Sequence, residues 1–323
     1  LLSPGPMANE YAKYSDTYVL SNFSIDNKVE LGSFIDEQFE FAYINTVVAG
    51  QLFPLLASQE LKLKGNVVVH VHEMEKVIEE NRASFDELRN HAIHYISASP
   101  ASTETLISKY EIPETKVTTV PAFIRIVDED LSNLDNLKQS SRNELGLEQK
   151  SFVVAGCGTV YWRKGPDIFL QAARQVLAQT KENIQFVWIG PGPDLDQILE
   201  SLSEEEKARI KFVGNKTNAN ELLAAADLFF MSSREDPFPL VVMEAAQHKV
   251  PSICFAETTG IKAFIQNDAG SCLPTMDIEG AAAEIIAYAE DRDLLVFKGL
   301  CARERVTDNY TTAKQCMNIF NTI

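Results

Sequence analysis

The chain has 323 residues, of which 45% are hydrophobic and 23% are charged, so its composition excludes a disordered or collagen-like protein. At roughly 100–200 residues per domain, this length predicts two domains. The formal net charge of -17 at pH 7 argues against nucleic acid as the main partner, because so acidic a surface repels a phosphate backbone.

The five cysteines are odd in number and lack any CxxC spacing, which argues against a disulfide framework or a structural zinc site and fits a reducing compartment. No apolar run approaches the roughly 18 residues that a membrane-spanning helix needs, and no signal peptide is evident. We therefore expect a cytoplasmic protein without a transmembrane segment, while peripheral contact with a membrane stays open. The cysteines are Cys157, Cys254, Cys272, Cys301 and Cys316.

Short apolar runs alternate with helix-like stretches along the chain, which is typical of parallel sheets covered by helices. In the first half, residues 75–91 have apolar side chains at three- and four-residue spacing, which predicts a helix. Residues 126–150 are polar and lack strand character, so we interpret them as a linker that includes a short helix. The strands predicted for the first half are residues 17–23, 39–45, 66–72, 92–99 and 116–123.

A more regular alternation follows the linker. Helices are predicted at 166–180 and 220–226, and the tail is a helix, a break near Asn309 and a second helix. The pattern predicts two doubly wound α/β domains in tandem, whose ligands bind at the carboxyl ends of the strands. The strands predicted here are residues 151–158, 184–190, 210–214, 227–233 and 251–256.

The domain boundaries follow from these elements. We assign residues 1–125 to an amino-terminal domain and residues 151–305 to a second domain. Residues 306–323 form a terminal helix that we expect to pack back toward the first domain.

The segment 232–256, SSREDPFPLVVMEAAQHKVPSICFA, carries the most chemistry. A strand ends there, and a helix begins near Pro239, a residue that the first turn of a helix tolerates. The free amides of Leu240 and Val241 would lie at the positive end of the helix dipole, which suits an anion. Asp236 and Glu244, with seven residues between them, form a carboxylate pair suited to hydroxyl-rich ligands.

This segment resembles the signature of retaining glycosyltransferases of family 4, which have the GT-B fold of two Rossmann-like domains facing each other across a cleft. The resemblance places Asp236 and Phe238 at the donor sugar and Glu244 at the nucleotide ribose. Glu235 offers a register shifted by one, but the spacing from Phe238 to Glu244 favours Asp236. The resemblance covers roughly residues 40–320, strongly in the second half.

A second segment, AGCGTVYWRKGPDIFLQAA at 155–173, resembles the element of that family that neutralises the donor pyrophosphate. Gly158 lets the backbone approach a ligand closely, and Lys164 matches the family lysine. Thr159 stands in the usual arginine place, and Arg163 is the candidate replacement, because its guanidinium can chelate phosphate oxygens. Pro239 stands where the family often has Gly, which removes one amide.

Weaker similarities extend the match. The WIGPG turn at 188–192 and the loop at 215–217 resemble the family's loops that lie near the nucleotide. The resemblance therefore implies that Gly190, Asn215 and Lys216 contact the ribose or the base. In the first half, VHVHEM resembles a strand end with a histidine near the donor sugar, here His72. The neighbouring His70 shares its strand face, but no third ligand has the spacing of a metal site, so we expect no metal.

The resemblance implies a metal-independent enzyme that transfers a sugar from a nucleotide-sugar, UDP- or GDP-linked, to an acceptor hydroxyl with retention of configuration. The acceptor is a glycan, a lipid-linked glycan or a small molecule, and glycan or glycoconjugate biosynthesis is the expected process. Catalysis is assigned to His72, Lys164 and Asp236, with no cofactor beyond the donor co-substrate.

The opening segment LLSPGPMANEYAKYSDTYVL does not match the first strand and glycine loop of the family, so either that part lies outside this sequence or the native chain is short. Two alternatives to the transferase stay open, and the unmatched start, Thr159 and Pro239 favour the first of them. One is a non-catalytic GT-B protein that binds a sugar nucleotide or a partner enzyme. The other is a different GT-B enzyme, either an inverting transferase or a sugar-nucleotide epimerase.

Overall fold

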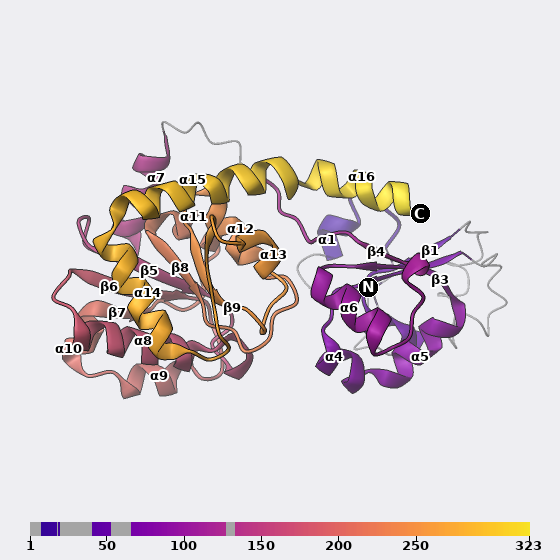
Figure 1. Cartoon of the computed structure of the whole chain (residues 1–323), viewed down its shortest axis with the longest axis horizontal. Helices are drawn as coiled ribbons and strands as arrows, with labels where there is room; N and C mark the ends of the chain where they lie inside the picture. Colours follow the sequence, from indigo (N-terminus) through magenta and orange to yellow (C-terminus); the bar gives the residue numbers. More distant parts are fainter. Residues whose placement is uncertain (1–7, 18, 20–40, 53–65, 127–132) are drawn as a thin grey trace. The chain divides into compact units, whose positions relative to one another are not determined.

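The computed structural model describes residues 8–17, 19, 41–52, 66–126 and 133–323. Contacts between residues divide the chain into two compact units. Unit 1 comprises residues 1–97 and 106–118, and unit 2 comprises residues 98–105 and 119–323. Each unit is built on its own parallel sheet flanked by helices (Figure 1).

The described residues of unit 1 form a four-stranded sheet in the order β1-β2-β3-β4. The strand predicted at 17–23 falls almost wholly outside the described residues, whereas the four later predictions for this half are confirmed. The elements are α1 (Ala8–Tyr11), β1 (Ala42–Ile44), the 3-10 helix η1 (Val47–Leu52), β2 (Val67–Val71), α4 (Glu75–Glu80), α5 (Arg82–His91), β3 (Ala92–Ser97), α6 (Pro100–Ser108, which begins in unit 2), the 3-10 helix η2 (Glu114–Lys116) and β4 (Val117–Thr119).

The helix predicted at 75–91 is divided into α4 and α5 at Asn81. The side-chain amide of Asn81 donates to the carbonyl of Val77, at 2.8 Å, so this residue caps the end of α4. Phe85 and Leu88 on α5 are fully buried and pack into the apolar core around β2. The apolar spacing therefore identified the buried face correctly and missed only the interruption.

Unit 2 contains a six-stranded parallel sheet in the order β10-β9-β8-β5-β6-β7. The elements are α7 (Leu134–Glu144), β5 (Phe152–Cys157), η4 (Trp162–Lys164), α8 (Pro166–Gln179), β6 (Ile184–Ile189), α9 (Leu195–Ser201), α10 (Glu204–Arg209), β7 (Ile210–Phe212), α11 (Ala219–Leu222), η5 (Leu223–Ala225), β8 (Leu228–Met231), α12 (Leu240–Gln247), β9 (Ser252–Phe255), α13 (Lys262–Ile265), β10 (Gly270–Leu273), α14 (Ile278–Glu290), α15 (Arg292–Asn309) and α16 (Thr312–Thr322).

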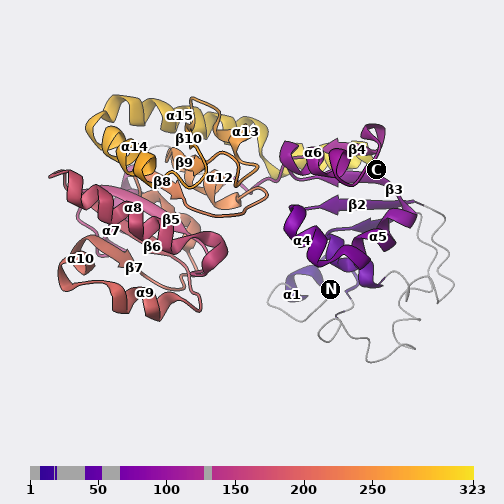
Figure 2. The same ribbon diagram turned by 60° about the horizontal axis from the view of Figure 1, so that its bottom comes forward.

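Two apolar layers enclose this second sheet, one on each face. One layer is formed with α8 and α14 and is rich in aromatic rings, among which Phe169 packs against Phe186 and Trp188. The other layer is formed with α11, α12, α13 and α15. Figure 2 shows α8 and α12 on opposite sides of β5 and β8. A strand that is covered on both faces has a continuous run of apolar residues in its sequence. The strands of the second half were therefore easier to recognise in the sequence than those of the first half.

The predicted helix starts and breaks of unit 2 are confirmed. Helix α8 begins at Pro166, α12 begins one residue after Pro239, and the linker contains α7. The break near Asn309 is the junction of α15 and α16. Strand β10 was not predicted from the sequence.

Candidate functional site

The order of strands in unit 2 defines where a ligand can enter. The chain passes from β5 outward to β6 and β7 and then returns to β8 on the other side of β5. In such sheets the loops that follow the two central strands diverge at their carboxyl ends and leave a crevice, which is where ligands bind. The loops after β5 and β8 carry Lys164 and Asp236, two of the residues singled out in the sequence.

The structure joins Lys164 and Asp236 directly. The ammonium group of Lys164 donates to the Asp236 carboxylate, and both side chains are largely buried, at 19% and 8% exposed. Asp236 is fixed in turn by its backbone, because its amide donates to the carbonyl of Thr258 at 2.9 Å.

Arg163 lies beside this pair. Its guanidinium donates to the carbonyl of Glu235 and to the hydroxyl of Tyr161, both at 2.9 Å, and Nη1 is 3.9 Å from the Asp236 carboxylate. Two cations therefore surround one carboxylate, and the surplus positive charge suits an anionic ligand.

Backbone contacts between the two loops keep these charges in place. The hydroxyl of Ser232 donates to the carbonyl of Gly165 at 2.8 Å, and the amide of Arg234 donates to the carbonyl of Arg163 at 2.8 Å. Gly165 has φ +68°, and a Cβ there would lie 2.1 Å from the carbonyl oxygen of Ser232. Only glycine therefore allows the two loops to approach this closely.

Sequence reasoning missed a second ion pair beneath these loops. The guanidinium of Arg234 donates to both carboxylate oxygens of Asp167, at 2.8 and 2.6 Å, and also to the carbonyl of Trp162. The pair lowers the pKa of Asp167, through the hydrogen bond to Arg234 first. An acidic residue at the first turn of α8 and an arginine after β8 were the available signals.

Two glycine turns extend the site toward β6. A Cβ on Gly190 would lie 2.1 Å from the carbonyl oxygen of Gly158, and both residues have φ near +145°. The indole nitrogen of Trp188 donates to that same carbonyl at 2.9 Å. The predicted phosphate-side and nucleotide-side glycines are thus in direct backbone contact, with no side chain between them.

Glu244 projects from α12 toward the end of β5. Burial raises its pKa, with no described hydrogen bond or opposite charge to lower it. Burial raises the pKa of the nearby Cys157 thiol to about 12, and the negative charge of Glu244 is the second cause of that rise. A half-buried carboxyl group next to the last residue of β5 is therefore available to accept hydrogen bonds from ligand hydroxyls.

The other residues assigned to the nucleotide and phosphates are distributed as follows. Leu240 is exposed and Val241 half-buried at the first turn of α12, where helix amides have no partner within the helix. Asn215 is exposed, and the ammonium of Lys216 is 3.9 Å from Glu144. The described interactions do not connect Asn215 or Lys216 with the Lys164–Asp236 pair.

The structure limits the part of Phe238 that can contact a donor sugar. Its ring is only 6% exposed and stacks on Tyr310, with 5.9 Å between ring centroids. The ring belongs to the core that joins α12 to the end of α15, so only the backbone of Phe238 is left to contact a sugar.

In unit 1, His72 directly follows β2. Its Nε2 is 2.9 Å from the side-chain oxygen of Asn45, and its ring lies over that of His70, with centroids 3.9 Å apart. Burial lowers the pKa of His72, and burial together with His72 lowers the pKa of His70 to about 3. Nδ1 of His70 is hydrogen-bonded to the hydroxyl of Tyr43. The two imidazoles are therefore neutral at pH 7. Among the described residues, no three metal-ligating side chains converge here or elsewhere.

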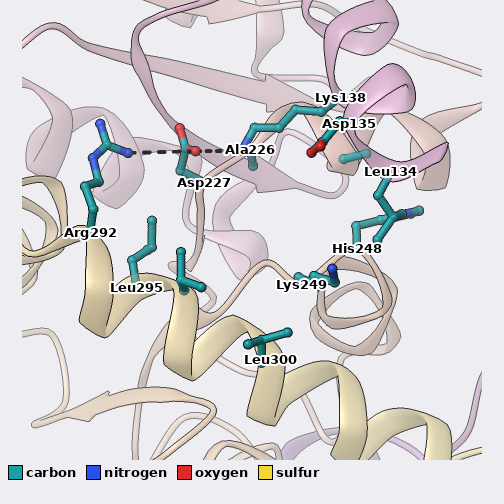
Figure 3. Close-up of a pocket in the computed structure, with 12 residues that line it drawn as sticks. Leu134, Asp135, Lys138, Ala226, Asp227, His248, Lys249, Arg292, Leu295 and Leu300 are labelled. Carbon is teal, nitrogen blue, oxygen red and sulfur yellow. Dashed lines mark hydrogen bonds and ion pairs between the residues drawn. The ribbon is translucent and has the colours of Figure 1, made fainter. Parts of the chain in front are cut away.

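A separate cavity of about 490 Å³ lies at the amino end of β8 (Figure 3). Its polar centre is Asp227, which accepts from Lys138 and Arg142 at 2.7 Å and from the amide of Val153 at 2.8 Å. Arg292 is 3.9 Å from the same carboxylate. These bonds tie α7 and α15 to the sheet, at the end opposite the loops that carry Lys164 and Asp236.

Two parallel sheets covered by helices, with the Lys164–Asp236 ion pair at the switch point of the second, are typical of α/β proteins that bind nucleotides. Residues 138–300, about half of the chain, match the family model of the glycosyl transferases group 1. The chain belongs to this family.

Curated relatives agree with that assignment. Alpha-galactosylglucosyldiacylglycerol synthase of Streptococcus pneumoniae is 30% identical over 175 residues, which cover 50% of this chain and 43% of the relative. N-acetyl-alpha-D-glucosaminyl L-malate synthase of Bacillus anthracis is 24% identical over 283 residues, 86% of this chain and 72% of the relative.

Solved structures confirm the fold class as GT-B. Anabaena HepE in complex with UDP and glucose superposes with a TM-score of 0.80 at 19% identity, over 99% of this chain and 89% of that chain. TarM superposes with a TM-score of 0.73 at 17% identity, over 91% and 57% of the respective chains. No helix in the described part of this chain is long and apolar enough to cross a bilayer.

Proposed function

We propose that this chain transfers a sugar from a nucleotide-sugar donor to an acceptor hydroxyl, with retention of anomeric configuration. The observation that carries the proposal is the Lys164–Asp236 ion pair at the switch point of unit 2, within the part of the chain that matches the family model. The complexes of HepE and TarM with UDP support a UDP-linked donor.

The pair suggests how a donor is received. When the donor diphosphate enters, it replaces Asp236 as the partner of Lys164, and Arg163 lies close enough to share its charge. The released Asp236 carboxylate then accepts hydrogen bonds from the hydroxyls of the sugar. Glu244, left without a described partner, accepts from the ribose hydroxyls.

The chemical step breaks the bond between the anomeric carbon and the diphosphate oxygen, so negative charge grows on the leaving group. Lys164, Arg163 and the amides at the start of α12 stabilise that charge, and groups fixed before the reaction do so without reorganisation. The departing phosphate takes the acceptor proton as the acceptor oxygen attacks the same face, so no enzymatic nucleophile is assigned. These cations perform the electrostatic role that a divalent metal has in other transferases.

His72 contacts the donor sugar in this proposal, with a neutral imidazole because burial lowers its pKa. The acceptor is a glycan, a lipid-linked glycan or a small molecule. We propose the cytoplasm as the site of action.

Calorimetric titration with UDP, GDP and ADP, without metal, tests the donor assignment. We expect micromolar binding of UDP, about -8 kcal/mol, and a loss of at least tenfold in Glu244→Ala. The exposed Glu200→Ala is the matched control and keeps the wild-type affinity. If none of the nucleotides binds the wild-type chain, the donor site is wrong and a non-catalytic role becomes the better explanation.

A further inference from the structure

Two cysteines face each other at one edge of the second sheet. Cys254 on β9 and Cys272 on β10 are directly paired in the register of these parallel strands, so their side chains leave the same face of the sheet. Their sulfur atoms are 3.6 Å apart, within hydrogen-bond distance for thiols. No sequence motif indicates this pair, because the two residues are 18 positions apart and lack a redox motif.

The two thiols differ in access. Cys254 is fully buried, whereas Cys272 is half-buried and lines an open cavity of about 620 Å³ together with Lys262. The hydrogen bond from Cys254, and then Lys262 and Lys298, lower the pKa of Cys272. The ammonium of Lys298 is held at β10 by the carbonyl of Gly270, 2.9 Å away. The accessible thiol is therefore the one that nearby cations activate.

The backbone geometry of the two strands suits a covalent bond. Neighbouring strands are about 4.8 Å apart, which lies inside the range of about 4.4–6.8 Å that disulfides require between Cα atoms. The sulfur atoms must still move from 3.6 Å to the bonding distance of about 2.05 Å, which requires side-chain rotation and a small approach of the two strands. The paired register means that neither strand needs to slide.

We propose that Cys254 and Cys272 form an oxidative modification site, at which a peroxide converts the thiol pair into an intramolecular disulfide. This inference is independent of the glycosyl-transfer proposal. The Cys272 thiolate attacks one oxygen of hydrogen peroxide, which gives a sulfenic acid and releases hydroxide. The Cys254 thiol then attacks the sulfenic sulfur, the S–S bond forms, and water leaves. In total, two thiols and one peroxide give one disulfide and two waters.

The other cysteines provide internal controls. Cys157, Cys301 and Cys316 are free thiols, and none is within sulfur hydrogen-bond distance of another cysteine among the described residues. Burial raises the pKa of Cys157 to about 12, and none of the described cysteines lies beside it to resolve a sulfenic acid, so we expect it to stay outside any disulfide.

The test counts thiols. The reduced full-length chain is treated with a small excess of hydrogen peroxide, unfolded, alkylated with iodoacetamide and weighed by mass spectrometry. Of the five cysteines we expect three to be alkylated, with a mass 2 Da below that of the reduced chain before alkylation and a peptide that links β9 to β10. Dithiothreitol added before alkylation restores all five.

Cysteine-to-alanine variants identify which two cysteines form the disulfide. Cys272→Ala and Cys254→Ala each prevent the crosslink, whereas Cys316→Ala retains it, with one fewer alkylated thiol. Circular dichroism confirms the fold of each variant, and Cys272→Ala answers the question if the buried Cys254→Ala does not fold. Five alkylated thiols after peroxide, sulfinic acid at Cys272 without a crosslink, or a bond to another cysteine or another chain would each overturn the proposal.

Discussion

The two sheets differ in the charged and titratable groups at the ends of their central strands. In unit 2, charged groups are buried in pairs at both ends of the strands: Lys164 with Asp236 at the carboxyl end, and Arg142 with Asp227 at the amino end. In unit 1, β2 and the residue after it carry two histidines whose ring centroids are 3.9 Å apart, and the described ion pairs of that unit are between solvent-exposed side chains.

The difference shows what each arrangement permits. A charge paired with an opposite charge can be buried and stay ionised, whereas an imidazole without such a partner must be neutral. The paired charges of unit 2 are therefore suited to an ionic ligand, whereas the neutral His70 makes the stability of unit 1 depend on pH.

The largest effect is expected at the paired charge of the switch point. Lys164→Ala should reduce the rate of sugar transfer about 10²–10³-fold, because a preorganised cation on the leaving group is lost. Initial rates with a UDP-sugar measure this, and the exposed Lys181→Ala serves as control. Equal rates for the two variants would remove Lys164 from the chemistry.

The pair at the other end of the strands should matter for stability instead. The guanidinium of Arg142 donates to Asp227 and to the carbonyls of Ala225 and Gln149. Arg142→Met leaves these buried acceptors without their hydrogen-bond donor. We expect a loss of about 3 kcal/mol in the free energy of unfolding, measured in urea. The more exposed partner Lys138→Ala should cost less than about 1 kcal/mol, and a similar cost for both would argue against the buried pair.

In unit 1, acid should destabilise the fold through His70. Its pKa is lowered to about 3 in the folded state, so below the unfolded value of about 6.5 only the unfolded chain takes up the proton. The stability is complete above that value and falls as the pH is lowered toward 3, by up to about 1.4 kcal/mol per pH unit. Urea titrations at pH 7 and pH 5 measure the loss. His70→Phe should make the free energy of unfolding nearly the same at the two pH values, whereas His91→Gln on the exposed end of α5 should leave the loss unchanged.

The smallest expected change in stability comes from relieving backbone strain, which occurs in both units. Lys249 after α12 and Glu111 after α6 are non-glycine residues with φ of +61° and +55°. Lys249→Gly and Glu111→Gly should each stabilise the chain by about 0.5–1 kcal/mol, because only glycine adopts this conformation without strain. A thermal melt that falls for Lys249→Gly would instead assign a stabilising contact to the lysine side chain.

Local sequence patterns were enough to predict most of the second sheet. Five of its strands agree with the predictions to within two residues at each end, because each is an apolar run bounded by turn residues. Strand β10 escaped because Gly270 and Ser271 lack strand character, and its backbone pairing with β9 fixes it instead. The same limit applies to α4 and α5, whose common apolar face concealed the cap at Asn81.

The candidate site was predictable residue by residue but not as an arrangement. Lys164 and Asp236 were each identified by a local motif, yet they are 72 positions apart, and only the order of strands brings them into contact. Phe238 shows the opposite case. The place of Phe238 in the motif suggested a ligand contact. In the structure its ring stacks on that of Tyr310, which lies far along the chain, and is buried in the core.

The backbone around Asp236 has a consequence for dynamics. Asp236 forms an isolated parallel bridge with Thr259, so pairing between the segments of β8 and β9 resumes beyond the ends of the strands. The amide of Asp236 is bonded to Thr258, and that of Gly260 to the carbonyl of Pro237 at 3.0 Å. These amides should exchange with deuterium as slowly as those of the sheet itself. A carboxylate on so rigid a support loses little conformational entropy on meeting its ligand, so more of the contact energy remains as affinity.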